Sequence, residues 1–219
     1  MRAGPNGVGM AYDLQEQDQL DAFRAFWNRW GNLILGVLTV ILLATAGWRA
    51  WNYWQQKQSV QAAVVYEQLS AAVQARDISK IKQASGELFE RYPATVYGSM
   101  AALVAAKAYF DAGDLKAAKA PLQWAADKAA DPEYRLLARL RLAGVLLDEK
   151  AYPEALQALS VPDAGAFAAA FADRRGDILV AQGQPAQARE AYQQALKHAG
   201  EANALRPLIQ LKLDALGGA

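Results

Sequence analysis

The chain contains no cysteine and only one histidine among its 219 residues. The lack of cysteine excludes disulfide bonds, thiolate metal sites and a cysteine nucleophile, and it suits a compartment in which stray thiols would oxidise. The single histidine, His198, comes at the end of a predicted helix. Because the helix dipole favours basic residues there, we expect no catalytic or ligand role for it.

The chain also lacks an excess of charge of either sign, with 23 basic and 22 acidic side chains. No overall field therefore draws it to nucleic acid. Motifs of zinc proteases, serine hydrolases and phosphate-binding loops are absent from the sequence. We expect no enzyme, no cofactor, no bound metal and no nucleic-acid partner.

One uncharged run of 19 residues, residues 30–48, lies between Arg29 and Arg49. As a helix it would be about 28 Å long, close to the hydrocarbon thickness of a bilayer. Five of the six tryptophans lie at or just outside its two ends, as in the aromatic belts of membrane proteins. We predict a transmembrane helix over residues 30–48 and expect the lipid bilayer to surround it.

Two other interpretations fit an apolar run of this length. A cleaved signal peptide would use the small residues 44–46, but these lie inside the run, and the residues before it are long and acidic rather than short and basic. A buried helix of a soluble protein would need no aromatic residues at both ends. The orientation stays open, because Arg24 and Arg29 before the run balance Arg49 and Lys57 after it.

The residues before the run divide into two segments. Residues 1–9 are rich in glycine and other turn-formers, so we predict a disordered leader over residues 1–11, with Met10 as a second candidate start. From residue 12 apolar residues recur near helical spacing among polar ones. Residues 12–29 are therefore predicted to form a short amphipathic helix leading into the membrane.

The remaining 171 residues, 49–219, contain almost no strand pattern, and apolar residues recur every three or four positions. Proline- and glycine-containing breakers divide them into helices of roughly 12 to 18 residues. Similar turns recur at Arg76, Gly113, Lys150 and Gly183, which are 37, 37 and 33 residues apart. This spacing is close to the period of about 34 residues that helix–turn–helix repeats use.

The clearest repeat follows this pattern from residue 174 to residue 195. Its small residue Gly176, its turn residue Gly183 and the series Ala188, Tyr192 and Ala195 resemble the tetratricopeptide repeat. The predicted fold is all-α: one transmembrane helix, a solenoid of such repeats, and a helix over residues 201–216 that closes the end. An irregular helical bundle is the alternative.

A solenoid of this kind presents a concave groove lined by the first helix of each repeat. Aligned with the repeat pattern, the candidate groove residues are Lys107, Phe110, Asp111, Leu140, Leu147, Asp148, Asp173, Asp177 and Val180. Their mixture of apolar and charged side chains suits an extended peptide or a partner helix. The alternative is that some of them pack against the terminal helix. A basic run (Arg135, Arg139 and Arg141) is most simply a solvated or salt-bridged face, and otherwise a site for an acidic segment.

In architecture and in several short stretches, the chain resembles the YfgM family, the ancillary SecYEG translocon subunits of Gram-negative bacteria. The stretches are residues 47–52, 140–143, 155–156, 173–176, 188–189 and 211–214, with Gly183. The resemblance implies an inner-membrane protein with a cytoplasmic N-terminus and a periplasmic repeat domain, residues 49–219. It also implies contact with the Sec translocon and with a membrane-anchored periplasmic chaperone, which together assist the folding of exported polypeptides.

Two alternatives remain beside this binding scaffold. One is a structural subunit of another envelope assembly or secretion complex. The other is a stress-response regulator that acts through its cytoplasmic segment.

Overall fold

The computed structural model describes residues 8–201 and 203–217, and every regular element in them is a helix. The all-α prediction is therefore confirmed. The chain divides into two compact units, Met1–Gln55 and Gln56–Ala219. Helix α1 (Val8–Gln74) contributes to both, and it includes the predicted amphipathic segment. Residues 1–7 of the predicted leader lie outside the described residues.

The predicted membrane span lies within α1, which from Arg24 onward has the length and apolar composition needed to cross a membrane. Its most apolar 18-residue window has a mean hydropathy of 1.9, and none of that window is buried inside the structure. The alternative of a buried core helix is therefore wrong. The hydroxyls of Thr39 and Thr45 donate to the carbonyls of Leu35 and Leu42, at 2.8 and 3.0 Å, which satisfies these donors inside the helix.

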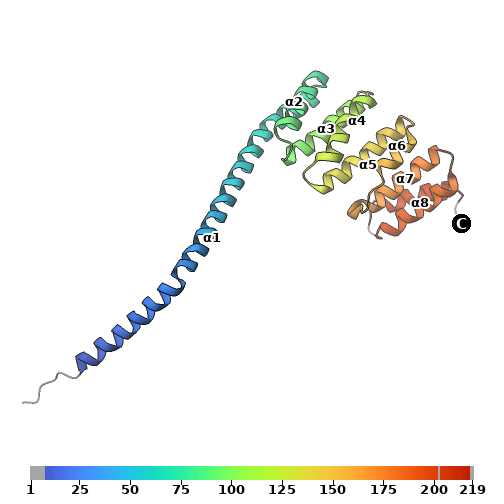
Figure 1. The fold of residues 1–219 in the computed structure, drawn as a ribbon. Coiled ribbons are helices and arrows are strands. Elements are labelled where there is room, and N and C mark those ends of the chain that lie inside the picture. Colours follow the sequence, from blue (N-terminus) through green and yellow to red (C-terminus); the bar gives the residue numbers. More distant parts are fainter. Residues whose placement is uncertain (1–7, 202, 218–219) are drawn as a thin grey trace, which may run out of the picture. The chain divides into compact units, whose positions relative to one another are not determined.

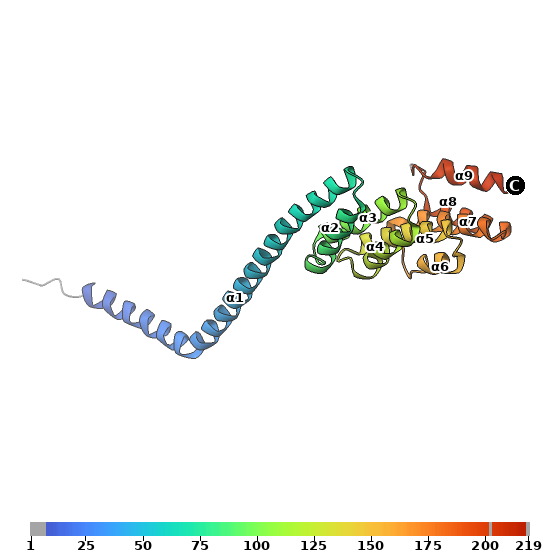
Figure 2. The same cartoon turned by 90° about the horizontal axis from the view of Figure 1, so that it is seen from above.

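The second compact unit is a chain of helix pairs in which each helix contacts the next ones in sequence (Figures 1 and 2). The last turns of α1 pair with α2, and the later pairs are α3 with α4, α5 with α6 and α7 with α8. The terminal helix α9 packs against α8 (Figure 2). The elements are α2 (Ile78–Arg91), α3 (Val96–Asp111), α4 (Leu115–Lys128), α5 (Pro132–Asp148), α6 (Tyr152–Ala158), the 3₁₀ turn η1 (Gly165–Phe167), α7 (Ala168–Ala181), α8 (Pro185–His198) and α9 (Arg206–Ala215).

Each pair is joined by the same turn, at the four positions that the sequence predicts. Arg76, Gly113, Lys150 and Gly183 all have positive φ angles, of 54°, 80°, 61° and 72°. Each of the four donates its N–H to the carbonyl three residues back, and the following residue donates to the carbonyl five residues back. This is the left-handed C-terminal motif that closes a helix by satisfying its last carbonyls.

Two of these left-handed positions carry a side chain, which predicts a stabilising substitution. Lys150 is exposed, so Lys150→Gly removes the strain of a left-handed non-glycine residue without losing a packed contact. We expect it to raise the free energy of unfolding by roughly 0.5 kcal/mol, since the strain relieved slightly exceeds the entropy that glycine adds to the unfolded chain. The matched change Gly113→Ala should lower it by about 1 kcal/mol. Chemical denaturation measures both, and a destabilised Lys150→Gly variant would contradict this account.

The core consists of two adjoining clusters of buried side chains. The larger one extends from the end of α1 to α7 and is dominated by alanine with fully buried Leu69, Leu88 and Leu122. The smaller one joins α7, α8 and α9 around Tyr192 and Ile209. Alanine lets neighbouring helices approach closely, so close-packed helix pairs replace a single thick core.

Two predicted helix lengths need correction. Helix α6 has only 7 residues, because Pro153 starts it and Pro162, by disfavouring helical geometry at the preceding residue, prevents it from continuing. Helix α9 begins at Arg206 rather than at residue 201, with Pro207 in its first turn. The position of His198 in the last turn of α8 is as predicted.

Candidate binding groove

The first helices of the last three repeats lie beside one another, since α3 contacts α5 and α5 contacts α7. Cavities along these helices form the candidate groove. Two of them are described here, as the charged cavity and the aromatic cavity.

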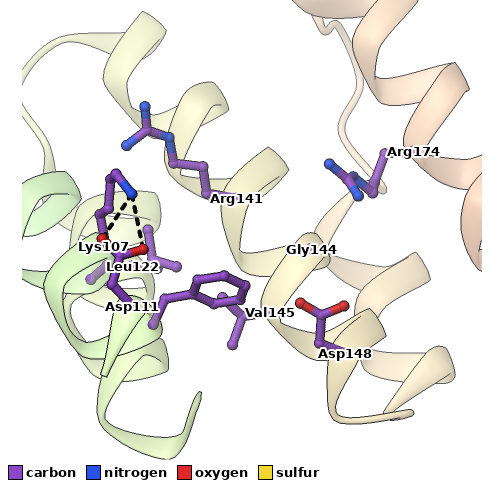
Figure 3. Close-up of a pocket in the computed structure, with 10 residues that line it drawn as sticks. Lys107, Asp111, Leu122, Arg141, Gly144, Val145, Asp148 and Arg174 are labelled. Carbon is purple, nitrogen blue, oxygen red and sulfur yellow. Dashed lines mark hydrogen bonds and ion pairs between the residues drawn. The ribbon is translucent and has the colours of Figure 1, made fainter. Parts of the chain in front are cut away.

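The charged cavity has a volume of about 340 Å³ and lies among α3, α4, α5 and α7 (Figure 3). Its apolar floor includes Phe110, whose side chain is 41% exposed, and Val145. Around this floor lie Lys107, Asp111, Arg141, Asp148 and Arg174. Lys107 Nζ donates to both carboxylate oxygens of Asp111, at 2.9 and 2.8 Å, so these two charges largely cancel.

The aromatic cavity has a volume of about 430 Å³ and lies among α1, α3, α5 and η1. Its lining is mostly apolar or aromatic and includes Tyr66, Met100, Tyr134, Leu137 and Phe167. Burial, with smaller effects from Tyr134 and Tyr97, raises the pKa of the Tyr66 hydroxyl. This cavity therefore keeps an uncharged phenol at neutral pH and suits apolar or aromatic side chains of a ligand.

Arg141 of α5 lines both cavities, so it lies at their boundary. Its side chain is exposed. Of the basic run, Arg139 lies 4.0 Å from Asp127, whereas Arg141 has no ion-pair partner within residues 8–201 and 203–217. The salt-bridged interpretation thus fits Arg139 and not Arg141.

Four of the predicted groove residues come together in the charged cavity: Lys107, Phe110, Asp111 and Asp148. Leu140 and Leu147 do not line it. They are half-buried and pack against the larger core cluster. Leu140 precedes Arg141 by one residue, which turns its side chain about 100° around the α5 axis, from the groove toward the core.

Asp173 and Asp177 are held by the terminal helix, as the alternative interpretation anticipated. Lys212 Nζ of α9 contacts both Asp173 oxygens at 2.8 and 2.9 Å and Asp177 Oδ1 at 2.7 Å. The Tyr192 hydroxyl donates to Asp177 Oδ1 at 2.9 Å. These two carboxylates therefore fasten α9 to α7. Val180 is 42% exposed.

This network predicts a pH dependence of stability. Burial raises the pKa of the Asp173 carboxyl, repulsion from Asp177 adds to the rise, and the bond from Lys212 opposes it. A raised folded-state pKa means that the folded chain holds the proton more tightly than the unfolded chain. This contribution is full below the ordinary pKa of 3.8 and is lost as the pH rises through the raised value.

The substitution Asp173→Asn removes that titration, while Lys212 keeps its contact with Asp177. We expect the variant to gain stability relative to the wild type as the pH rises above 3.8, and to lie within about 1 kcal/mol of it at pH 7. Urea titrations at a series of pH values measure the difference. A difference that does not change with pH would contradict the assignment.

The aromatic cavity and Arg141 were not predicted as parts of the groove. On α5 a signal was present, because Tyr134, Leu137, Arg141, Val145 and Asp148 follow one another at intervals of three and four residues. Tyr66 and Phe167 give no such signal, since they reach the cavity from elements far away in the sequence.

A third cavity, of about 680 Å³, lies beside the short helix α6 and includes Arg175, Glu190 and His198 in its lining. Among the described residues, no three histidine, aspartate or glutamate side chains are grouped so as to hold a metal ion.

Comparison with known proteins places the chain in a family. A family model described as a tetratricopeptide repeat-like domain matches residues 24–218. A protein of Neisseria gonorrhoeae named ancillary SecYEG translocon subunit is 32% identical over 208 residues, which cover 94% of this chain and 100% of the relative. A protein of the same name from Escherichia coli is 29% identical over 201 residues, covering 92% of this chain and 96% of the relative.

A third protein of this name, from Haemophilus influenzae, is 28% identical over 94% of this chain and 100% of its own length. No solved structure matches the chain. One apolar helix, a repeat-like domain over nearly all of the remaining length and relatives aligned from end to end agree with one another. The chain belongs to the family of ancillary SecYEG translocon subunits, with a tetratricopeptide repeat-like domain.

Proposed function

We propose that this chain is a polypeptide-binding scaffold of the bacterial inner membrane that associates with the Sec translocon. The observation that carries the proposal is the lining of two neighbouring cavities by the first helices of successive repeats, with an unpaired cation between them. Such a surface offers apolar pockets and polar anchors but no catalytic group. The names of the relatives supply the translocon as the partner.

The proposed arrangement puts residues 12–29 in the cytoplasm, residues 30–48 across the bilayer and residues 49–219 in the periplasm. In this arrangement the groove faces polypeptides as they leave the translocon. Arg24 and Arg29 on one side balance Arg49 and Lys57 on the other, so the orientation needs a direct test. A reporter that is active only in the periplasm, fused after Ala219, should be active, and a matching cytoplasmic reporter should be silent. The reverse result would contradict the arrangement.

The groove partners we propose are exported polypeptides and a membrane-anchored periplasmic chaperone. Anchoring in the same membrane raises the effective concentration of such partners, so modest affinity for the groove is sufficient. This proposal accounts for cavities that are open and partly charged rather than deep and apolar.

Site-specific crosslinking tests the groove as the place of contact. A photoreactive residue at Phe110, which lines the charged cavity, should form adducts with translocon subunits, a chaperone or exported chains. The matched control is Ile78, at the start of α2, because its side chain is 42% exposed, against 41% for Phe110, and it lies in neither groove cavity. Equal adducts from both positions, or none from Phe110, would count against the groove. Adducts with proteins of another envelope assembly complex would instead support the alternative function.

A further inference from the structure

One face of helix α5 extends through both cavities of the groove. Tyr134 and Leu137 lie in the aromatic cavity, Arg141 at the boundary, and Val145 and Asp148 in the charged cavity. Intervals of three and four residues keep these side chains on the same side of the helix. From Tyr134 to Asp148 this face is about 21 Å long, so an extended segment of about six residues can lie along it.

Arg141 is the uncompensated charge at the middle of this face. Of the other cations at the charged cavity, Lys107 is paired with Asp111, and Arg174 lies 3.6 Å from Asp177. Figure 3 shows the Arg141 side chain leaving α5 on the side of Lys107, and no ion pair joins it to Asp111 or Asp148. A guanidinium with no acidic partner of its own, between two largely apolar cavities, is complementary to a carboxylate of the ligand.

We propose that the groove selects extended polypeptide segments in which an acidic residue lies between two apolar residues, a preference that rests on the proposed polypeptide-binding function. The acidic side chain pairs with Arg141. The spacing follows from the helix, because Leu137 and Val145 are each about 6 Å along the axis from Arg141, the reach of about two residues of extended chain. One apolar side chain fills the aromatic cavity and the other covers Phe110 and Val145.

The charges at the ends of the face add direction to this preference. Asp148 has no ion-pair partner among the described residues and lies at the far end of the charged cavity. It repels a second acidic residue placed beyond the apolar one and attracts a basic residue there. A segment with the order apolar, acidic, apolar, basic therefore matches the face along its whole length.

The experiment is a selection of random twelve-residue peptides, displayed on phage, against the full-length chain in detergent. Three forms are compared: the wild type, Arg141→Glu and the control Lys116→Glu. Both substituted side chains are exposed cations without an ion pair in the described part of the chain, and Lys116 lies in neither groove cavity. We expect the wild type and the control to enrich an acidic residue about two positions from apolar residues. Arg141→Glu should keep the apolar preference and replace the acidic residue by lysine or arginine.

Affinities of selected peptides then test the pairing directly by fluorescence anisotropy. Replacing the central aspartate of a peptide by asparagine should weaken its binding to the wild type by about three- to fivefold, and by less at high salt. The same replacement should not weaken binding to Arg141→Glu. Peptides that are apolar without acidic enrichment, or that respond equally in all three forms, would overturn this inference and leave the proposed function intact. If no peptide binds at all, both fail.

Discussion

The substitution Gly176→Ala should lower the free energy of unfolding of the repeat domain by about 3 kcal/mol. A Cβ atom at position 176 would lie 2.3 to 2.8 Å from three ring atoms of Tyr192. The ring is buried, its hydroxyl is bonded to Asp177 and the ammonium of Lys212 lies 5.7 Å from its centre, so it cannot move without breaking the contacts that hold α7, α8 and α9 together. For a domain of this size we expect the melting temperature to fall by roughly 6–12 °C, which circular dichroism measures.

The control for this prediction is the same substitution elsewhere in the chain. A Cβ atom at Gly86, inside α2, meets nothing within 4 Å, so Gly86→Ala should stabilise the domain by roughly 0.5–1 kcal/mol through helix propensity. Combining Gly176→Ala with Tyr192→Leu should cost less than the sum of the two single changes, because the smaller side chain removes the clash. Strictly additive losses would show that the contact between Gly176 and the ring is not the cause.

The double substitution Leu38→Asp with Leu42→Asp should remove the chain from the membrane fraction. These two leucines lie near the middle of the apolar span, on the same side of α1, and are 49% and 68% exposed. Each aspartate adds roughly 2.5–3.5 kcal/mol to the free energy of inserting the helix into a bilayer. We expect most of the variant to be released by alkaline carbonate extraction, whereas the wild type stays with the membrane.

The matched control places the same charges at the same spacing on the same helix. Val60 and Val64 are 62% and 55% exposed but lie beyond the predicted span, so Val60→Asp with Val64→Asp should leave the chain in the membrane fraction. Circular dichroism of both variants in detergent should show unchanged helix content, which separates failed insertion from failed folding. Membrane retention of the Leu38 and Leu42 variant would contradict the assignment of the span.

The sequence predicted best the features that depend on neighbouring residues. The uncharged run needs only its own composition, and the four turns need only a chain that must leave a helix at a particular residue. At Arg76 and Lys150 the turn was found from the period of the sequence although no glycine marks it. The length of α6 was predicted wrongly because the regular period was weighted above the two prolines that bound this helix.

The groove was predicted in part for the same reason. Lys107 and Asp111 lie four residues apart on one helix, so their pairing and common direction follow from local geometry. The direction of Leu140 and Leu147 depends instead on how α5 is rotated about its axis by its neighbours. The aromatic cavity needs Tyr66 and Phe167, which are about a hundred residues apart in the sequence and meet only after the helices stack.

By itself the sequence determined the membrane helix, the all-α class, the repeat turns and the small residue facing Tyr192, since each depends on composition or on spacing within one repeat. Only the tertiary structure decided which side chains are free to bind. Lys212 reaches Asp173 across 39 positions of sequence and takes it and Asp177 out of the groove, whereas no acidic group approaches Arg141 closely enough to pair with it among the residues described. The physical reason is that the charge a ligand meets is the charge left after folding has paired the others, and that pairing depends on distances in space.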